Sequence, residues 1–531
     1  MSTVNSPANC FRGNPQIEKD EKETDGRNTL GCRKIIKRRN EKMNGRGCGI
    51  LLPVFSLPSP YGIGTLGKEA FAFIDFLERA GQKYWQILPV GPTSYGDSPY
   101  QSYSIYAGNP YFIDLDILKE EGLLEPEELP EKEEVSHIDY AELYHTRFGT
   151  LQKAFERFDA KSRDFAGFLK EETHWIKDYG LFMSLKDANE GKSWNLWTKE
   201  LRDRTEEGMA AAAKKYEKEI LFWEFVQYEF FRQWRAVKEY ANQKGIKIIG
   251  DIPIYVAYDS VDVWAQPEYY ELDEEKNPIN VAGCPPDGFS ATGQLWGNPL
   301  YNWERMEKED FAWWVRRLDS ATTLYDVVRI DHFRGFESYF SIPFGSVTAQ
   351  GGVWRKGPGI RLFREVEKKL GKRELIAEDL GYLTPEVEQL LKDSGYPGMK
   401  LLQFAFDSRE AGNYLPHNYG KNSVVYIGTH DNDTVLGWLD ALSHGDFKRM
   451  LAYLNLDSDK DIAWKLIRIA LGTVCDTAVL MMQDLLELGS EARINTPSTL
   501  GGNWTWRAPK DAFSHILADK LRDAVSVYER I

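Results

Sequence analysis

The feature that most constrains the fold is a set of short apolar stretches that each end in an acidic residue. Residues 327–330 are apolar apart from Arg329, and Asp331 follows them directly. Residues 375–377 lead in the same way to Glu378, and residues 424–427 lead within four positions to Asp431. In parallel α/β sheets, reactive groups collect at the carboxyl ends of the strands. We therefore expect these three carboxyl groups to lie at one end of a shared parallel sheet.

Three converging carboxyl groups require an explanation, because burying an unpaired carboxylate is costly. Asp331 on its own could be an ion-paired strand end, since Arg329 and Arg334 are close in sequence. A set of three indicates either a hard metal ion or a reaction that uses carboxyl groups in different protonation states. The aspartate-rich runs 431–433 and 457–461 lack the loop pattern of a hand-type calcium site. We expect no metal and no cofactor, with structural calcium left as an open alternative.

Strand and helix patterns alternate along the chain. We predict strands near residues 84–90, 246–253, 327–331, 374–378, 400–404, 424–427 and 478–482, with helices at 68–81, 311–325 and 360–370 between them. This alternation predicts a (β/α)8 TIM barrel, and an irregular eighth strand is favoured over an open sheet. Residues from about 115 to 240 read as mainly helical, with patterns at 144–158, 165–181 and 220–240. We expect this block to be a helical insertion that forms a subdomain around the active-site face.

Composition bounds the class of protein. A chain of 531 residues that is 42% hydrophobic can form a large barrel with insertions. Its 66 Lys and Arg against 81 Asp and Glu argue against a nucleic-acid partner. No apolar run approaches the roughly 18 to 20 residues that a membrane span needs. Five cysteines, an odd number without Cys-x-x-Cys spacing, favour a reducing cytoplasm.

The first 44 residues differ from the rest. They are polar and show no helical or strand period, so we predict disorder there and a folded domain over residues 45–531. The segment has no apolar core of a secretory signal, and its acidic residues disfavour a transit peptide. Met43 directly precedes the patterned region and is an alternative start of translation.

The order of the three acidic motifs resembles the catalytic regions of the α-amylase clan of retaining glycosidases. More narrowly, the chain resembles glycoside hydrolase family 77, the 4-α-glucanotransferases known as amylomaltases or disproportionating enzymes. The narrower resemblance rests on segments that follow the family order from about Gly49 to the end of the chain, namely residues 49–53, 56–64, 96–102, 107–111, 283–290, 293–299, 493–497 and 503–504.

The resemblance implies a role for each carboxyl group. Asp331 would be the nucleophile, Glu378 the general acid and base, and Asp431 the residue that stabilises the oxocarbenium-like transition state. Arg329 lies two positions before Asp331 on the same strand face, so we expect it to keep the pKa of Asp331 low. A neighbouring negative charge, from Asp379 or Asp331, would raise the pKa of Glu378.

The resemblance also implies residues that bind substrate. Tyr100, on a turn-rich loop, would stack on the sugar next to the cleaved bond. Trp296 would belong to a lid over residues 283–300 that excludes water and so favours transfer over hydrolysis. Asp251, at the end of its own strand, would support the site, and His430 would donate to sugar hydroxyls. The full predicted binding set is Tyr100, Asp251, Trp296, Arg329, His332 and His430.

The implied function is transfer of an α-1,4-glucan segment from a maltooligosaccharide donor to the 4-hydroxyl of another glucan or of glucose. The partners would be maltooligosaccharides and larger α-1,4-glucans, and the protein would be a monomer or a homodimer. Two alternatives stay open: a retaining α-glucan hydrolase of the same clan, and a catalytically silent glucan-binding protein. The preferred glucan and the formation of cyclic glucans are not fixed by the sequence.

Overall fold

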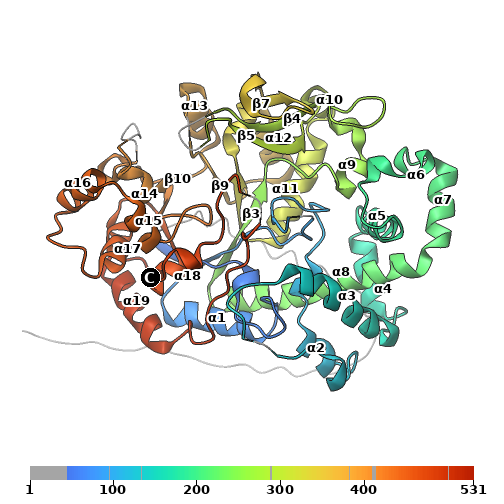
Figure 1. The fold of residues 1–531 in the computed structure, drawn as a ribbon, viewed down its shortest axis with the longest axis horizontal. Coiled ribbons are helices and arrows are strands. Elements are labelled where there is room, and N and C mark those ends of the chain that lie inside the picture. The colour runs from blue at the N-terminus through green and yellow to red at the C-terminus, as the bar shows by residue number, and fades with distance from the viewer. Residues whose placement is uncertain are drawn as a thin grey trace, which may run out of the picture. The chain divides into compact units, whose positions relative to one another are not determined.

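The computed structural model describes residues 45–531, apart from 95, 133, 287–289, 382, 409–413 and 500, so the predicted leader lies outside the described residues. Its centre is an eight-stranded parallel barrel surrounded by helices (Figure 1). This confirms the predicted TIM barrel. In order around the barrel the strands are β10 (Gly398–Leu401), β11 (Ser423–Tyr426), β12 (Thr477–Met481), β1 (Gly47–Leu51), β2 (Tyr84–Gln86), β3 (Lys247–Pro253), β6 (Val327–Asp331) and β9 (Leu375–Ala377).

The barrel closes between β9 and β10. The backbone N–H of Ala377 donates to the carbonyl of Pro397 at 3.0 Å. The N–H of Met399 in β10 donates instead to the side chain of Asp379, at 2.6 Å. The buried carboxylate of Asp379 therefore takes the place of a backbone acceptor where β9 meets β10, and it helps to close the barrel.

The eighth strand, absent from the sequence prediction, is β1. It lies between β12 and β2 and pairs in parallel with both. The sequence of β1 does not show a clear strand pattern, because Gly47 and Gly49 interrupt the run of apolar residues. Gly49 is required by the close approach of β2, since a Cβ at this position would lie 2.5 Å from Cβ of Tyr84.

The predicted strand at 400–404 is displaced in the structure. The strand β10 ends at Leu401, and Leu402–Ala405 forms the short helix α14. The apolar run continues through both elements because Leu401 and Leu402 are buried alike. A short apolar run does not distinguish a strand from a buried helix, which explains the error.

Helices connect the strands and cover the barrel. Their bounds are α1 (Lys68–Arg79), α2 (Leu115–Glu120), α3 (Tyr140–Arg157), α4 (Arg163–Glu171), α5 (Ile176–Ala188), α6 (Lys199–Arg202), α7 (Glu206–Lys215), α8 (Glu217–Gln243), α9 (Val261–Ala265), α10 (Trp303–Lys308), α11 (Ala312–Leu324), α12 (Ile360–Leu370), α13 (Pro385–Ser394), α14, α15 (Val435–Ala441), α16 (His444–Leu454), α17 (Ile462–Gly472), α18 (Met482–Leu485) and α19 (His515–Val527). None of these described helices is both long and apolar enough to cross a membrane.

The helices α2 to α8 lie between β2 and β3 in the sequence and occupy one side of the view in Figure 1. The predicted helix at 165–181 is two helices, α4 and α5, with a break between them. The long helix α8 anchors the chain that follows β2. The amide of Gln227 exchanges two hydrogen bonds with the backbone of Gly108, and Gln233 does the same with Asp114. The loop that carries Tyr100 is thereby fastened to the helical block.

A second, antiparallel sheet has the strand order β5-β4-β7-β8 and was not predicted. Its strands are β4 (Asn280–Cys284), β5 (Gln294–Pro299), β7 (Ser338–Pro343) and β8 (Val353–Lys356). In Figure 1, β4, β5 and β7 lie together at the top of the view. The segment expected to be a lid loop, 283–300, is therefore largely the β4–β5 hairpin. Residues 287–289 near its tip lie outside the described residues.

Candidate active site

Asp251, Arg329 and Asp331 form an ion-paired group on two neighbouring strands. Asp251 in β3 is the direct partner of Arg329 in β6, and Asp331 lies two positions further on the same face. Nη1 of Arg329 donates to Oδ2 of Asp251 at 2.6 Å and to Oδ1 of Asp331 at 3.0 Å. The exposed fractions of the side chains of Asp251 and Asp331 are 0% and 28%, respectively. Asp331 can therefore meet a ligand, whereas Asp251 acts through Arg329.

Asp251 lies within its strand and not at the end of it. Asp251 was expected at the end of its strand, but β3 continues through Ile252 to Pro253. The extra residues pair with Ile330 and Asp331 of β6. This pairing keeps the backbone of Asp331 inside the sheet and limits its movement.

Glu378 follows β9 and is held by backbone donors. Its Oε2 accepts from the N–H of His332 and its Oε1 from the N–H of Leu380, both at 2.7 Å. His332 has a left-handed backbone, with φ of 52°, and this turns the chain sharply after Asp331. The turn thus brings the strand end of Asp331 and the side chain of Glu378 together.

The pKa values of the two carboxyl groups are both raised. Burial raises the pKa of Asp331 well above its usual range, Arg329 opposes this, and the charges of Asp251, Glu378 and Asp431 raise it further. Burial also raises the pKa of Glu378, against Arg329 and the two N–H donors. The expectation that Arg329 keeps the pKa of Asp331 low is therefore wrong in its net direction. Two facing carboxyl groups of this kind retain one proton more readily than two solvated ones.

Asp431 follows β11, and neighbours from the C-terminal segment hold it. Nδ2 of Asn495 donates to Oδ1 of Asp431 at 2.6 Å, and Arg493 donates to the backbone carbonyl of Asp431 at 2.9 Å. Nε2 of His430 lies 3.4 Å from Oδ2 of Asp431. The side chain of Asp431 is 43% exposed, so it remains accessible to a ligand.

Tyr100 links three of these elements. Its hydroxyl donates to Oδ2 of Asp251 at 2.9 Å and shares a 2.8 Å hydrogen bond with Nε2 of His430. Its ring stacks on His430 with centroids 5.4 Å apart and contacts Trp504 at 5.9 Å. His430 is buried, and burial lowers its pKa, so the ring is neutral at pH 7. The predicted contact of His430 with sugar would therefore need its buried ring to become accessible.

Trp296, in β5, reaches the site from the second sheet. Its ring meets the ring of His332 edge to face, with centroids 4.8 Å apart. Burial lowers the pKa of His332 to about 3, so this ring is also neutral. The backbone carbonyl of Trp296 and the side chain of Asn298 accept from Gln101, which ties the hairpin to the loop of Tyr100.

Three contributors were missed as site residues. Asn495, Arg493 and Trp504 belong to segments whose order matched the family, but no strand or acidic motif marked them. They reach the site from segments 62 to 73 positions beyond Asp431, a proximity that sequence spacing alone does not reveal.

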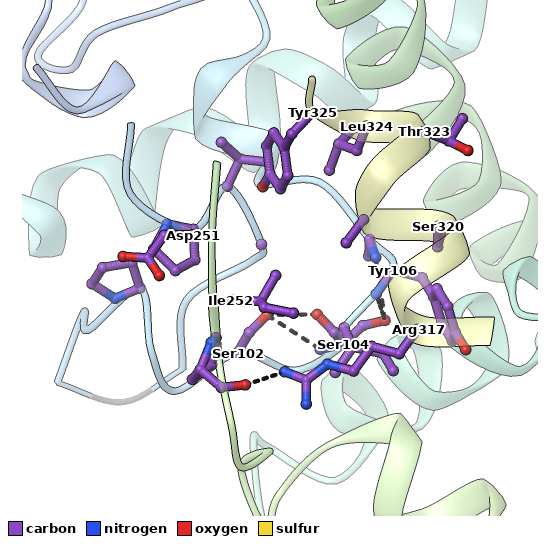
Figure 2. Close-up of a pocket in the computed structure, with 18 of the residues that line it drawn as sticks. Ser102, Ser104, Tyr106, Asp251, Ile252, Arg317, Ser320, Thr323, Leu324 and Tyr325 are labelled. Carbon is purple, nitrogen blue, oxygen red and sulfur yellow. Dashed lines mark hydrogen bonds between the residues drawn. The ribbon is translucent and has the colours of Figure 1, made fainter. Parts of the chain in front are cut away.

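A cavity of about 160 Å³ lies behind Asp251. Figure 2 shows that it is bounded by the loop with Ser102, Ser104 and Tyr106 on one side and by α11 with Ser320 and Leu324 on another. Arg317 donates to the carbonyl of Ile254 at 2.9 Å and also to that of Pro253. This arginine therefore fixes the chain just after β3, next to the ion-paired group.

An eight-stranded parallel barrel with two carboxyl groups of raised pKa at the carboxyl ends of adjacent strands has the design of a barrel glycosidase or transglycosidase. Comparison with known proteins narrows this class. The family described as 4-alpha-glucanotransferase matches residues 52–512. The chain therefore belongs to the 4-alpha-glucanotransferase family and is a glycosyl-transferring enzyme.

Individual relatives agree over nearly the whole length. The 4-alpha-glucanotransferase of Clostridium butyricum is 50% identical over 483 residues, which are 90% of this chain and 99% of the relative. That of Thermus thermophilus is 47% identical over 500 residues, 92% of this chain and 99% of the relative. Among solved structures, the amylomaltase of Streptococcus agalactiae in complex with acarbose has a TM-score of 0.89 at 41% identity and covers 91% of this chain and 99% of its own.

Proposed function

We propose that the chain carries out 4-α-glucan transfer by a double displacement in which Asp331, Glu378 and Asp431 play the roles that the family resemblance implies. The observation that carries this assignment is the pairing of Asp331 and Glu378 at the ends of the adjacent strands β6 and β9, each with a raised pKa. Asp331 receives a hydrogen bond from the charged side chain of Arg329, whereas the donors to Glu378 within the described residues are the backbone N–H groups of His332 and Leu380. Of the two groups, Asp331 is therefore the one that we propose stays ionised, and Glu378 is the one that holds the shared proton.

In the first half-reaction, an oxygen of Asp331 attacks the anomeric carbon of the donor glucose. The bond from that carbon to the glycosidic oxygen breaks, and Glu378 gives its proton to the departing 4-oxygen. In the second half-reaction, the 4-hydroxyl of an acceptor attacks the same carbon, its proton passes to Glu378, and the bond to Asp331 breaks. Two inversions retain the α-configuration.

The remaining residues position these groups. The charge that develops on the sugar ring is positive, so the accessible carboxylate of Asp431 stabilises it. Asn495 limits the rotation of Asp431, while Arg329 fixes Asp331 through its second bond to Asp251. Nε2 of His332 has no hydrogen-bond partner in the part of the chain that the structure describes, and it can serve a sugar hydroxyl.

The substrates that we propose are maltooligosaccharides and larger α-1,4-glucans, in agreement with the names of the relatives. The excess of acidic over basic residues, 81 Asp and Glu against 66 Lys and Arg, supports the proposal that nucleic acid is not a partner. The cysteine pattern supports a cytoplasmic location. For the oligomeric state, we propose a monomer or a homodimer.

The test of this function is incubation with maltotriose while chain lengths and reducing ends are followed together. Transfer predicts glucose and longer chains at a nearly constant number of reducing ends. Rising reducing ends without longer chains would instead support the hydrolase alternative. Glucan binding without any turnover would support the silent binding protein.

Trp296 offers a test of how transfer prevails over hydrolysis. We propose that the β4–β5 hairpin acts as the lid, because Trp296 contacts His332 beside the nucleophile. Removing the ring in Trp296→Ala opens the site to water, so the ratio of hydrolysis to transfer should rise about tenfold, the effect of roughly 1.4 kcal/mol between the two barriers. The measurement is the rate of reducing-end release divided by the rate of glucose transfer.

Leu295→Ala is the matched control for this experiment. Leu295 is the neighbour of Trp296 in β5, so its side chain points to the opposite face of the sheet. The ratio should stay at the wild-type value in this variant. An unchanged ratio in Trp296→Ala would contradict the lid assignment.

A further inference from the structure

Trp504 has an unusual backbone conformation next to the active site. Its φ is 64°, in the left-handed region that bulky side chains rarely adopt. The residue is buried, and its ring packs on the rings of Tyr100 and His430, with centroids 5.9 and 6.1 Å apart, respectively. Strained conformations of this kind persist only where surrounding contacts hold them, and they are frequent at functional sites. The contacts that hold Trp504 therefore affect the active site.

Two hydrogen bonds fix the backbone of Trp504. Its N–H donates to the carbonyl of Ile494 at 2.7 Å, which joins it to the C-terminal segment that holds Asp431. Its carbonyl accepts from the hydroxyl of Tyr140 at 2.9 Å. Tyr140 comes from a different part of the chain, 364 positions earlier in the sequence. One of the two bonds that hold this strained residue thus comes from a side chain without another role in the reaction.

Tyr140 is held in place by the start of the helical block. It is the first residue of α3, and the chain that enters this helix runs beside the C-terminal segment. The N–H of Ile138 donates to the carbonyl of Thr505 at 2.8 Å. An antiparallel bridge between His137 and Trp506 continues this pairing. Paired backbone on both sides therefore determines where the hydroxyl of Tyr140 lies.

The hydroxyl of Tyr140 is a neutral donor. Burial raises the pKa of Tyr140 further above its ordinary value, so the hydroxyl keeps its proton at pH 7. The proton is directed to the carbonyl of Trp504. A phenylalanine at position 140 would fill nearly the same space but would leave this carbonyl without its donor. Trp504 would then be held in its strained conformation by one hydrogen bond fewer.

The ring of Trp504 supports two residues that contact the carboxyl groups of the site. The hydroxyl of Tyr100 donates to Asp251, and it shares a hydrogen bond with Nε2 of His430. The same Nε2 atom lies 3.4 Å from Oδ2 of Asp431. Movement of Trp504 would allow both supported rings to shift. Because small misplacements of reacting groups lower rates strongly, such a shift would slow the reaction.

We propose that Tyr140 is a positioning residue for glucan transfer, whose hydroxyl holds Trp504 in the conformation that supports the two rings beside the carboxyl groups. The proposal rests on the proposed transferase function, because the groups that are positioned perform that reaction. Tyr140 acts through Trp504, and the helical block thereby contributes to the active site of the barrel.

The experiment compares Tyr140→Phe with wild type on maltotriose. We expect kcat and kcat/KM for glucose release to fall together by about three- to tenfold, while KM stays within about twofold. This pattern is expected because the lost hydrogen bond serves alignment in the transition state and not the binding of substrate. Thermal unfolding of both proteins establishes that the assay temperature lies below the unfolding transition, so that only folded protein contributes to the rates.

Tyr258→Phe is the matched control. The hydroxyl of Tyr258 also donates to the carbonyl of a left-handed residue, Lys276, at 2.7 Å, and φ of Lys276 is 68°. The ring of Tyr258 packs on Trp194, outside the active site. This variant loses the same kind of hydrogen bond, and its kcat should stay within about twofold of the wild-type value. Equal decreases of kcat in Tyr140→Phe and Tyr258→Phe would contradict a positioning role.

A double variant tests whether Tyr140 acts through Trp504. Trp504→Ala should lower kcat by at least about tenfold, because both supported rings lose their neighbour. Adding Tyr140→Phe to Trp504→Ala should cause no further decrease, since the two residues act as one unit. Additive decreases in the double variant, or wild-type kcat in Tyr140→Phe, would overturn the proposal. Failure of the wild type to convert maltotriose would instead overturn the transferase function.

Discussion

Replacing Asp331 with Asn is expected to lower the rate of maltotriose disproportionation by at least about 10³-fold, because an amide cannot form the glycosyl-enzyme. The fold should survive the change. Arg329 retains its bond to Asp251, the side-chain oxygen of asparagine can still accept from Arg329, and a neutral side chain avoids the cost of burying a charge. The thermal midpoint should therefore be equal to or above that of the wild type. The measurements are initial rates of glucose release from maltotriose and thermal unfolding followed by circular dichroism.

The matched control is Asp484→Asn. Asp484 is also a buried aspartate, and burial raises its pKa to about 7. It accepts from the N–H of Val435 at 2.8 Å, which an asparagine oxygen can also do. This variant should retain activity within about threefold. The contrast between the two variants separates the position of the carboxyl group from the mere loss of a buried charge.

A chemical signature distinguishes a nucleophile from a structural residue. In Asp331→Gly, the space left by the carboxylate admits azide, which can attack the anomeric carbon of α-glucosyl fluoride with loss of fluoride. The product would be the β-glucosyl azide, formed by a single inversion. Wild-type rates in Asp331→Asn, or an α-configured azide product, would refute the assignment of Asp331 as the nucleophile.

The alternating period of strands made much of the active site predictable. Residues 329 and 331 share a face because side chains alternate along a strand, and the structure bonds Arg329 to Asp331. Parallel strands place their ends at one edge, so the carboxyl groups of Asp331 and Glu378 could be expected to meet. The net direction of the shift in the pKa of Asp331 could not be predicted, because the shift depends on burial by neighbours that are distant in the sequence.

The parts of the fold that escaped prediction share a physical cause. The strand β1 contains Gly49 because β2 approaches too closely for a side chain, so packing overrides the apolar pattern. The second sheet pairs β4 with β7, whose residues are 57 to 63 positions away in the sequence, with the barrel strand β6 between them in the chain. Such long-range pairings leave no local signal, and β8 is a mostly exposed strand without an apolar face.

The largest expected effect on stability comes from Arg530, near the C-terminus. Its side chain is fully buried, and its guanidinium donates to the backbone carbonyls of Gly47, Leu471, Thr473, Cys475 and Asp476 at distances from 2.7 to 3.2 Å. These carbonyls belong to the start of β1, the end of α17 and the chain that enters β12. One side chain thus joins the C-terminal segment to the neighbouring strands β1 and β12, the first and last barrel strands in the sequence.

Replacing Arg530 with Ala should lower the free energy of unfolding by about 3 to 5 kcal/mol, because it leaves a void and removes five hydrogen bonds to backbone carbonyls. Burial lowers the pKa of Arg530 to about 10, so the residue is charged at pH 7 and the loss should be constant between pH 6 and 8. Arg530→Lys, with three donors in place of five, should lose less. The measurement is urea-induced unfolding of each variant at pH 6, 7 and 8.

Arg522→Ala is the control for this prediction. Arg522 also donates to backbone carbonyls, those of Glu78 and Arg79, but it is exposed to solvent. Water can replace its hydrogen bonds, so the variant should change the free energy of unfolding by less than about 0.5 kcal/mol. Equal unfolding midpoints for Arg530→Ala and Arg522→Ala would show that the buried guanidinium does not stabilise the contact between β1 and β12. Because the active site lies at the opposite, carboxyl end of the barrel strands, KM for maltotriose below the unfolding transition should be unchanged in both variants.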